Sequence, residues 1–240
     1  MVGLLLAVAA TGCNADQWYR GGWPAPVTIQ GKHALGLWQG SLVAGLAVGG
    51  FVLFLIVFAA LAYRAKGDRL PRQVKYNIPL EIAYTVVPVV VVAYLFYFTA
   101  VTENFENKLT KNPDVTIGVV GFQWNWQFNY VNEKLQVTGR PGEIPQLVIP
   151  TNRTIRFVET SPDVIHSFWV IPFLFKRDVV PGRHNEFEVT VTKTGVFDGK
   201  CAEYCGADHD RMLFSVRAVT PAQYDAFVKA AQQQQTGSTQ

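Results

Sequence analysis

The sequence contains few cysteines, few methionines and little net charge. Three cysteines and two methionines occur among its 240 residues. So few cysteines cannot build the disulfide framework of a small secreted domain, and each cysteine therefore needs its own explanation. The formal net charge is only +3, and the basic residues form no stripe or tail. We therefore expect no nucleic-acid partner.

Charge is missing altogether from two long segments. No charged residue lies between Ala34 and Tyr63 or between Ile82 and Thr102. Each segment has the roughly 20 apolar residues that a helix needs to cross a bilayer, and Pro88 is tolerated inside a membrane helix. Two core helices of a soluble protein would instead need partner surfaces on all sides. The sequence predicts transmembrane helices over residues 34–63 and 81–102.

The segment between these two helices, residues 64–80, is basic. It contains a single acidic residue, Asp68, and five basic ones, which are Arg64, Lys66, Arg69, Arg72 and Lys75. Because loops rich in Lys and Arg stay in the cytoplasm, this loop is predicted to be cytoplasmic. The chain would then cross the cell membrane twice, with both ends and the C-terminal domain on the outer side.

The N-terminal segment, residues 1–33, contains the cysteine that stands alone. Cys13 follows the apolar run Leu4 to Ala10 and two small residues. This pattern is typical of a lipoprotein processing site, at which Cys13 would be lipidated. The first residues lack the positive charge of a signal peptide, so an unprocessed apolar N-terminus with an idle thiol is the alternative.

After Asn112-Pro113 the pattern changes to short β-branched and aromatic segments separated by Gly, Pro and Asn, which predicts an all-β domain over residues 113–220. Their number and spacing suit a Greek-key sandwich or barrel. Residues 221–240 follow, with a helix from Pro221 to Ala231 capped by Thr220, and a Gln-rich tail that we expect to be disordered. The predicted strands are Val115–Val120, Gln123–Tyr130, Gln146–Ile149, Thr154–Glu159, His166–Val170, Glu186–Val191, Gly195–Lys200 and Leu213–Val219.

One loop between two predicted strands carries four metal-binding side chains, in the order Cys201, Cys205, His209 and Met212. Thiolate, imidazole and thioether together select copper over magnesium, calcium or manganese. A mononuclear blue copper site needs only one cysteine. The second thiolate therefore indicates two metals bridged by both sulfurs, with one imidazole each from His209 and the upstream His166.

Weak axial positions remain in such a centre. Met212 can fill one, and the backbone carbonyl of Glu203, inside the loop, can fill the other. Because no coordination position stays open for a substrate, the site suits electron transfer and not bond chemistry. The alternatives are a Cys201–Cys205 disulfide and a structural zinc site. Neither of them accounts for Met212.

Over residues 28–220 the chain resembles subunit II of the bacterial haem-copper cytochrome c oxidases. The resemblance is carried by the copper loop and by the segments Val164–Trp169, Asp178–Arg183 and Phe122–Trp126. It implies a two-helix transmembrane hairpin followed by an all-β, cupredoxin-like Greek-key domain with the binuclear copper centre called CuA. The ligands of that centre would be His166, Cys201, Glu203 through its carbonyl, Cys205, His209 and Met212.

The resemblance also implies partners. The centre would take electrons from cytochrome c, or from a cytochrome subunit of a supercomplex, and pass them to haem in subunit I, which reduces oxygen to water. Other oxidase subunits and the lipid bilayer complete the expected surroundings. A CuA-bearing subunit of nitric oxide reductase is an alternative that this chain alone separates poorly. A metal-free subunit II of a quinol oxidase is another, but such relatives lack the cysteines.

Four residues receive roles from the resemblance. The carboxylate of Glu203 would ligate a magnesium ion shared with subunit I. Trp124 would be the exposed tryptophan through which electrons enter, with Trp126 buried beside it. Asp163 would dock the cytochrome, and Glu81 would stand at the entrance of a proton channel, or else be an ordinary acidic residue at a helix N-terminus. From residue 103 onward 14 basic residues face 15 acidic ones; no strongly acidic docking face is therefore expected.

Overall fold

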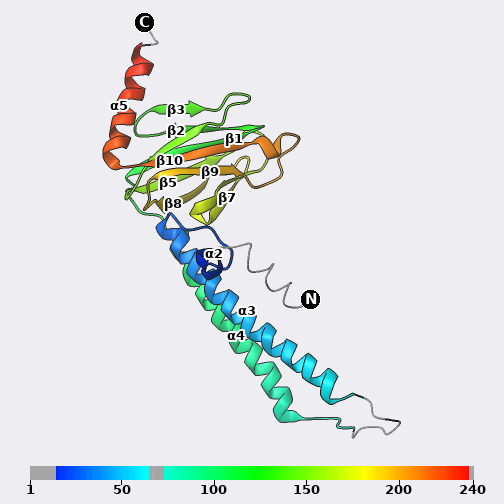
Figure 1. Ribbon diagram of the computed structural model, residues 1–240. Coiled ribbons are helices and arrows are strands. Elements are labelled where there is room, and N and C mark those ends of the chain that lie inside the picture. Colours follow the sequence, from blue (N-terminus) through cyan, green and yellow to red (C-terminus); the bar gives the residue numbers. More distant parts are fainter. Residues whose placement is uncertain (1–14, 65–66, 68–72, 238–240) are drawn as a thin grey trace. The chain divides into compact units, whose positions relative to one another are not determined.

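The computed structural model describes residues 15–64, 67 and 73–237, with the side chains of 235–237 left aside (Figure 1). The predicted lipidation site Cys13 lies outside these residues, and so do seven residues of the basic segment, including Lys66, Arg69 and Arg72. The chain divides into two compact units. One is formed by Gly36–Glu103, and the other combines the residues up to Leu35 with those from Asn104 onward.

Two long helices carry the uncharged segments. They are α3 (Ile29–Ala62) and α4 (Ile78–Glu106), and both are long and apolar enough to span a membrane. Their most apolar stretches are not buried within the chain, unlike the core helix of a soluble protein. We conclude that lipid or partner helices surround them. The chain is thus a two-pass membrane protein.

Both helices begin before the uncharged runs because polar side chains cap them. The backbone N–H of Gly31 donates to Thr28 Oγ1 at 2.8 Å, so α3 begins at Ile29. Leu80 N–H donates to Asn77 Oδ1, and α4 begins at Ile78. Caps of this kind satisfy the N–H groups that have no partner in the first helical turn.

The β domain contains ten strands in two five-stranded sheets (Figure 1). The first sheet has the order β3-β2-β1-β5-β8 and the second β4-β10-β9-β6-β7. Both are mixed, because β1 runs parallel to β5 and β4 parallel to β10. The strands are β1 (Val115–Phe122), β2 (Asn125–Tyr130), β3 (Leu135–Thr138), β4 (Gln146–Pro150), β5 (Thr154–Thr160), β6 (His166–Val170), β7 (Phe175–Val179), β8 (Asn185–Thr190), β9 (Gly195–Cys201) and β10 (Leu213–Val219).

The predicted fold class, a membrane hairpin followed by an all-β Greek-key domain of cupredoxin type, is confirmed. All eight predicted strands are present with small shifts at their ends, but β3 and β7 were not predicted. β7 is rich in charge, with Lys176, Arg177 and Asp178 in five residues, and β3 has only four residues. Pairing with β6 and β2 forms these strands, not their own propensity.

The core lies between the two sheets and is aromatic. Alternate residues of β1, β2 and β5 are buried, as expected for strands with one face on a core. Phe168 stands at the centre, with its ring stacked on Phe214 at 4.6 Å between centroids and near Trp126 at 5.7 Å. Edge-to-face and offset pairs of this kind add about 0.5–1.5 kcal/mol each beyond the apolar area they bury. This rigid core holds β6 and β9, which carry two of the predicted metal ligands.

The C-terminal helix α5 (Pro221–Gly237) is longer than predicted. The Thr220 cap is present, because Gln223 N–H donates to Thr220 Oγ1 at 3.3 Å. The expected disorder after Ala231 is wrong as far as Gly237, since helix continues through the glutamines. Glutamine is a good helix former, and Gln232 Nε2 also donates to the Glu133 carbonyl at 3.0 Å. Residues 238–240 lie outside the description.

Candidate metal centre

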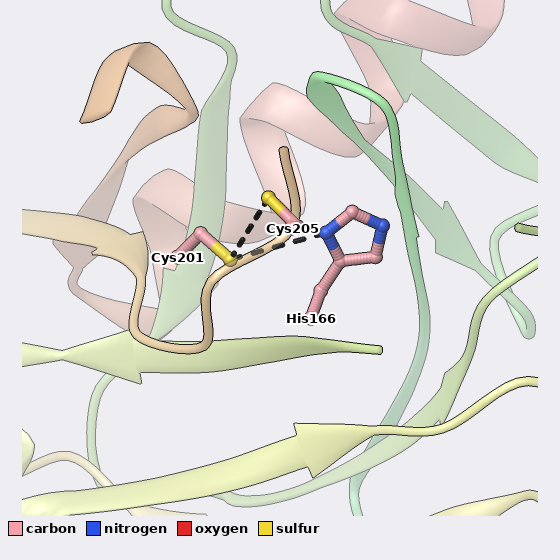
Figure 2. Close-up of side chains that lie close together, drawn as sticks. All are labelled: His166, Cys201 and Cys205. Atoms are coloured by element: carbon pink, nitrogen blue, oxygen red, sulfur yellow. Dashed lines mark hydrogen bonds between the residues drawn. The ribbon is translucent and has the colours of Figure 1, made fainter. Parts of the chain in front are cut away.

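The predicted ligands meet where β6 and β9 lie side by side. His166 is the first residue of β6 and Cys201 the last of β9, and the two strands pair through Phe168 and Cys201. The loop after β9 brings Cys205 back beside them, and the short 3-10 helix η2 (His209–Arg211) carries His209. Figure 2 shows the thiol of Cys201 facing both the thiol of Cys205 and the imidazole of His166.

The donor atoms form two matching sets. Cys201 Sγ lies 3.9 Å from His166 Nδ1 and 3.2 Å from the Glu203 carbonyl oxygen. Cys205 Sγ lies 3.5 Å from His209 Nδ1 and 3.8 Å from Met212 Sδ. Each thiol therefore has one imidazole and one weaker donor of its own. All six groups named from the sequence are brought together.

The two sulfurs are 3.8 Å apart, far more than the roughly 2.05 Å of a disulfide. Both cysteines are free and buried. Because Cys201 and Cys205 are aligned with separate imidazoles, the arrangement differs from the predicted alternative of a disulfide. A zinc site would leave the thioether of Met212, which is fully buried against Cys205, without a role.

A negative charge on one thiol disfavours a negative charge on the other. Burial raises the pKa of Cys201, but hydrogen bonds with the His166 side chain and with backbone groups of the surrounding loop and strand outweigh burial and bring the pKa down to about 7. Burial and the neighbouring Cys201 thiolate both raise the pKa of Cys205. Without a cation the pair therefore favours a single negative charge. For both thiols to be ionised, a bound cation would have to supply the missing positive charge.

Asp163 orients the imidazole of His166. Its Oδ1 lies 2.8 Å from His166 Nε2, and its carboxylate also accepts N–H bonds from Gln123 at 2.7 Å and Val164 at 2.6 Å. Burial raises the pKa of Asp163, but these hydrogen bonds together lower it below its usual value. With the Nε2 proton directed at Asp163, Nδ1 is left to face the thiol.

These hydrogen bonds bear on the docking role predicted for Asp163. The side chain is 28 % exposed and has four polar partners within the chain, of which Ser161 Oγ is the fourth. A carboxylate with four polar partners in its own chain has little hydrogen-bonding capacity left for a partner protein. Docking by Asp163 stays a prediction, while its contact with the predicted ligand His166 is a feature of the structure.

Trp124 contacts the metal loop directly. Its indole Nε1 donates to the Cys205 carbonyl at 3.2 Å, and Gln123 Nε2 donates to the same oxygen at 2.8 Å. Trp124 is half-buried and lies in the turn between β1 and β2, whereas Trp126 on β2 is fully buried. Because residues two apart on a strand share a face, the turn is what separates the two indoles.

A buried layer under the loop holds the ligands from below. Trp126 Nε1 donates to the Met212 carbonyl at 3.4 Å, and its ring centroid lies 6.2 Å from that of His166. Gly121 on β1 leaves room for both rings, since a Cβ atom there would lie 3.1 Å from Trp126 and 3.2 Å from His166. Neither Gln123 nor Gly121 was singled out in the sequence, where an amide and a glycine beside aromatic residues carry no signal of their own.

The two remaining acidic residues with predicted roles are Glu203 and Glu81. The side chain of Glu203 is exposed, and among the described residues no further cluster of three His, Cys, Asp or Glu ligands accompanies it. Glu81 lies in the first turn of α4, where its Oε1 accepts the N–H of Asn77 at 3.1 Å. That bond is a reciprocal cap of the helix N-terminus, which accords with the alternative of a helix-terminal acid.

Comparison with known proteins identifies the family. The family model described as "Cytochrome C oxidase subunit II, periplasmic domain" matches residues 143–219, the stretch that includes every predicted metal ligand. The probable cytochrome c oxidase subunit 2 of Streptomyces avermitilis is 44 % identical over 98 % of this chain and 86 % of that protein. The chain belongs to the cytochrome c oxidase subunit II family. It is therefore a subunit of a haem-copper oxidoreductase.

A further curated relative agrees with this assignment. Cytochrome c oxidase subunit 2 of Mycobacterium tuberculosis (strain ATCC 25618 / H37Rv) is 36 % identical over 93 % of this chain and 78 % of its own length. Among solved structures, the periplasmic domain of subunit II of cytochrome oxidase from Bradyrhizobium japonicum is 33 % identical, covers 52 % of this chain and 99 % of its own, and has a TM-score of 0.48. Family membership and the buried cluster of His166, Cys201 and Cys205 together support copper in this chain.

Proposed function

We propose that this chain holds a binuclear copper centre through which electrons enter a cytochrome c oxidase. The observation that carries the proposal is the pairing of donors, in which each of two free thiols 3.8 Å apart has its own imidazole and its own weak ligand. The residues would be His166, Cys201, Cys205, His209, Met212 and the Glu203 carbonyl. Copper bound there supplies one-electron redox chemistry.

The protein supplies a cage that changes little between redox states. Cys201 and Met212 are almost fully buried, and His166 has no exposed surface. Asp163 fixes one imidazole, while Trp124 and Gln123 fix the carbonyl of Cys205. Because His166 and the backbone of Cys205 are each held by further contacts, little movement accompanies the arrival or departure of an electron. We therefore expect fast electron transfer with little reorganisation of the ligands.

Trp124 offers a direct connection from the surface to the copper loop. Its half-buried ring lies at the edge of the domain, and a single hydrogen bond of 3.2 Å joins the indole to the backbone of Cys205. We infer that electrons from cytochrome c, or from a cytochrome subunit of a supercomplex, enter through this ring. They would leave toward the haem of subunit I.

Replacement of Trp124 by Phe tests this route. The variant loses the indole N–H but keeps an aromatic ring, so copper content and absorption should stay close to those of the parent while electron uptake from reduced cytochrome c slows by at least about tenfold. Tenfold corresponds to about 1.4 kcal/mol in the barrier. Trp18→Phe, in the short helix α2 (Ala15–Tyr19), is the matched control, since Trp18 is exposed and belongs to no part of the centre. An unchanged uptake rate in Trp124→Phe would contradict the route.

Magnesium is a separate proposal that rests on Glu203. Its carbonyl faces Cys201 while its carboxylate is exposed, so one residue can serve two metals through different atoms. Carboxylate and water are the ligands that magnesium prefers. The remaining ligands would come from subunit I.

The orientation of the chain in the membrane is proposed from the charges of the loop. Arg64, Lys75 and the other basic residues of 64–80 place this loop in the cytoplasm by the positive-inside rule. The β domain then lies on the outer face of the cell membrane, where a cytochrome c is found. Lipidation of Cys13 would add an anchor on the same side, and the mass of the mature N-terminus tests it.

A further inference from the structure

The β domain has a second hollow that contains none of the predicted metal ligands. Its volume is about 360 Å³, and it is lined by Trp23, Trp169, Ile171, Leu174, Phe175 and Lys176, with Pro24 at its edge. The lining combines two indoles and three other apolar side chains with a single charged residue. Leu174 adopts a left-handed backbone conformation, with φ of 56°, which is uncommon for a bulky residue and can mark a functional position.

One wall of this hollow is bonded to the residues at the start of α3. Val27 N–H donates to the Pro172 carbonyl at 3.0 Å, and Thr28 Oγ1 donates to the Phe173 carbonyl at 3.2 Å. The 3-10 helix η1 (Ile171–Phe173) is thereby joined to the residues that lead directly into α3. Gly31 packs so closely on it that a Cβ atom would lie 2.4 Å from the Phe173 carbonyl oxygen.

This junction lies a short way before the uncharged run of α3. The uncharged run begins at Ala34, five residues after Ile29, and helix rises 1.5 Å per residue, so the two are separated by about 8 Å. The headgroup layer on each side of a bilayer is itself roughly 5–8 Å deep. The residues of η1 that are bonded to Val27 and Thr28 are therefore joined to the chain within about two helical turns of this uncharged run.

Positive charge flanks the hollow on the outer face of its sheet. Trp169 on β6 pairs in register with Lys176 on β7 and with Lys200 on β9. The Lys200 ammonium lies 4.8 Å from the Trp169 ring centroid, and the Lys176 ammonium lies 3.8 Å from Asp178, with both side chains about half exposed. Two ammonium groups on either side of an indole are well suited to hold a phosphate above an apolar floor.

Other large aromatic side chains gather in the same segment of chain. Trp18 is 58 % and Tyr19 81 % exposed on α2, a few residues before Trp23. Tryptophan and tyrosine concentrate where membrane meets water, because their rings are apolar and their N–H or O–H groups are polar. The segment therefore has the composition of a membrane surface contact.

We propose that this hollow binds an anionic phospholipid of the outer leaflet. The glycerol and upper acyl carbons lie against Trp23, Ile171 and Leu174, and the phosphate is held by Lys176 and Lys200. The lipid ties the β domain to the membrane surface beside the start of α3. This binding is independent of the metal centre and of the route by which electrons reach it.

Photo-crosslinking in the assembled oxidase tests the proposal. The enzyme is placed in nanodiscs that contain a phosphatidylglycerol probe with a photoreactive group near the glycerol, and crosslinked peptides of this chain are mapped by mass spectrometry. A phosphatidylcholine probe of the same design is compared. We expect crosslinks in residues 169–176 from the anionic probe, reduced about fivefold by each of Lys176→Glu and Lys200→Glu.

Lys229→Glu is the matched control, because Lys229 is exposed on α5, which Figure 1 shows at the end of the domain opposite β7. It should leave the crosslinks unchanged, and copper absorption should be unchanged in all three variants. The proposal is overturned if the probe labels α3 and α4 but not residues 169–176. It is also overturned if both probes label the hollow equally, or if the hollow is covered by another oxidase subunit and takes no lipid.

Discussion

Replacing Asp163 with Asn separates two roles that the sequence could not distinguish. Asp163 Oδ2 accepts the Gln123 N–H, while Oδ1 faces Val164 N–H and His166 Nε2. An asparagine amide has one oxygen and one NH₂ group, so whichever way it turns, its NH₂ faces at least one of these donors. In either orientation the ring of His166 loses the negative charge beside Nε2, and when the NH₂ group takes the Oδ1 position the ring also loses the acceptor that directs Nδ1 toward Cys201.

The size of the effect follows from the contacts. Loss of a group that orients a metal-binding histidine typically lowers metal affinity by 10- to 100-fold, which is about 1.4–2.7 kcal/mol. We expect a loss in this range, since His166 is fully buried and the remaining ligands are untouched. Copper affinity of the metal-free protein is measured by competition with a chelator of known affinity, with absorption and electron paramagnetic resonance as readouts.

Asp198→Asn is the matched control, since Asp198 is an exposed carboxylate on β9, the strand that also carries Cys201. It should leave copper affinity unchanged. The reasoning is refuted if Asp163→Asn binds copper as tightly as the parent but takes up electrons from cytochrome c more slowly, with altered salt dependence. That outcome would favour the docking role, because rim charges act mainly on association rates.

Three further predictions concern other acidic residues. Glu203→Gln should lower the magnesium or manganese content of the oxidase with copper absorption nearly intact; loss of copper instead would count against the division of roles between its carbonyl and carboxylate. Glu81→Gln should slow turnover and reduce proton pumping if the residue stands at a proton channel, whereas unchanged values would leave it the helix cap seen at Asn77. Glu159 is fully buried, and neither carboxylate oxygen has a hydrogen-bond partner among the described residues. Burial raises its pKa well above 4.5, although the charge of Arg177 opposes this. Above pH 4.5 the unfolded state therefore binds fewer protons than the folded state, and the free energy of unfolding falls by up to about 1.4 kcal/mol per pH unit until the folded pKa is reached. Glu159→Gln should remove this loss, so its stability advantage in chemical denaturation of the β domain should grow as pH rises from 4.5; an advantage that is the same at every pH would contradict the assignment.

Much of the fold could be predicted because its signals are local. Uncharged runs such as Ala34–Tyr63 directly indicate membrane helices. The alternating burial in β1 and β5 follows from the alternation of residue types in the sequence. Strand β7 could not be predicted, because Lys176, Arg177 and Asp178 become a strand only through pairing with β6. The length of α5 was also missed, since packing of the helix against β3 and β4 and the bond from Gln232 to Glu133 are long-range contacts.

That the proposed metal ligands would cluster was predictable for a chemical reason, whereas the residues that contact them were not predictable. A cysteine, histidine or methionine in a tight loop has few uses other than binding a soft metal. Asp163 and Gln123 serve the site through hydrogen bonds that depend on where β1 and the loop before β6 meet in space. A carboxylate three residues before a histidine is equally compatible with docking a partner or orienting the ring; the 2.8 Å contact with Nε2 shows the second, and docking stays a prediction.

The central claim is that both thiols belong to one centre with two copper ions. Metal analysis of the purified protein, combined with electron paramagnetic resonance of its oxidised form, tests it most directly. We predict two copper ions per chain and the hyperfine pattern of one unpaired electron shared equally by two copper nuclei, both lost together in Cys205→Ser. One copper ion per chain with the pattern of a single nucleus, or zinc in its place, would contradict the account.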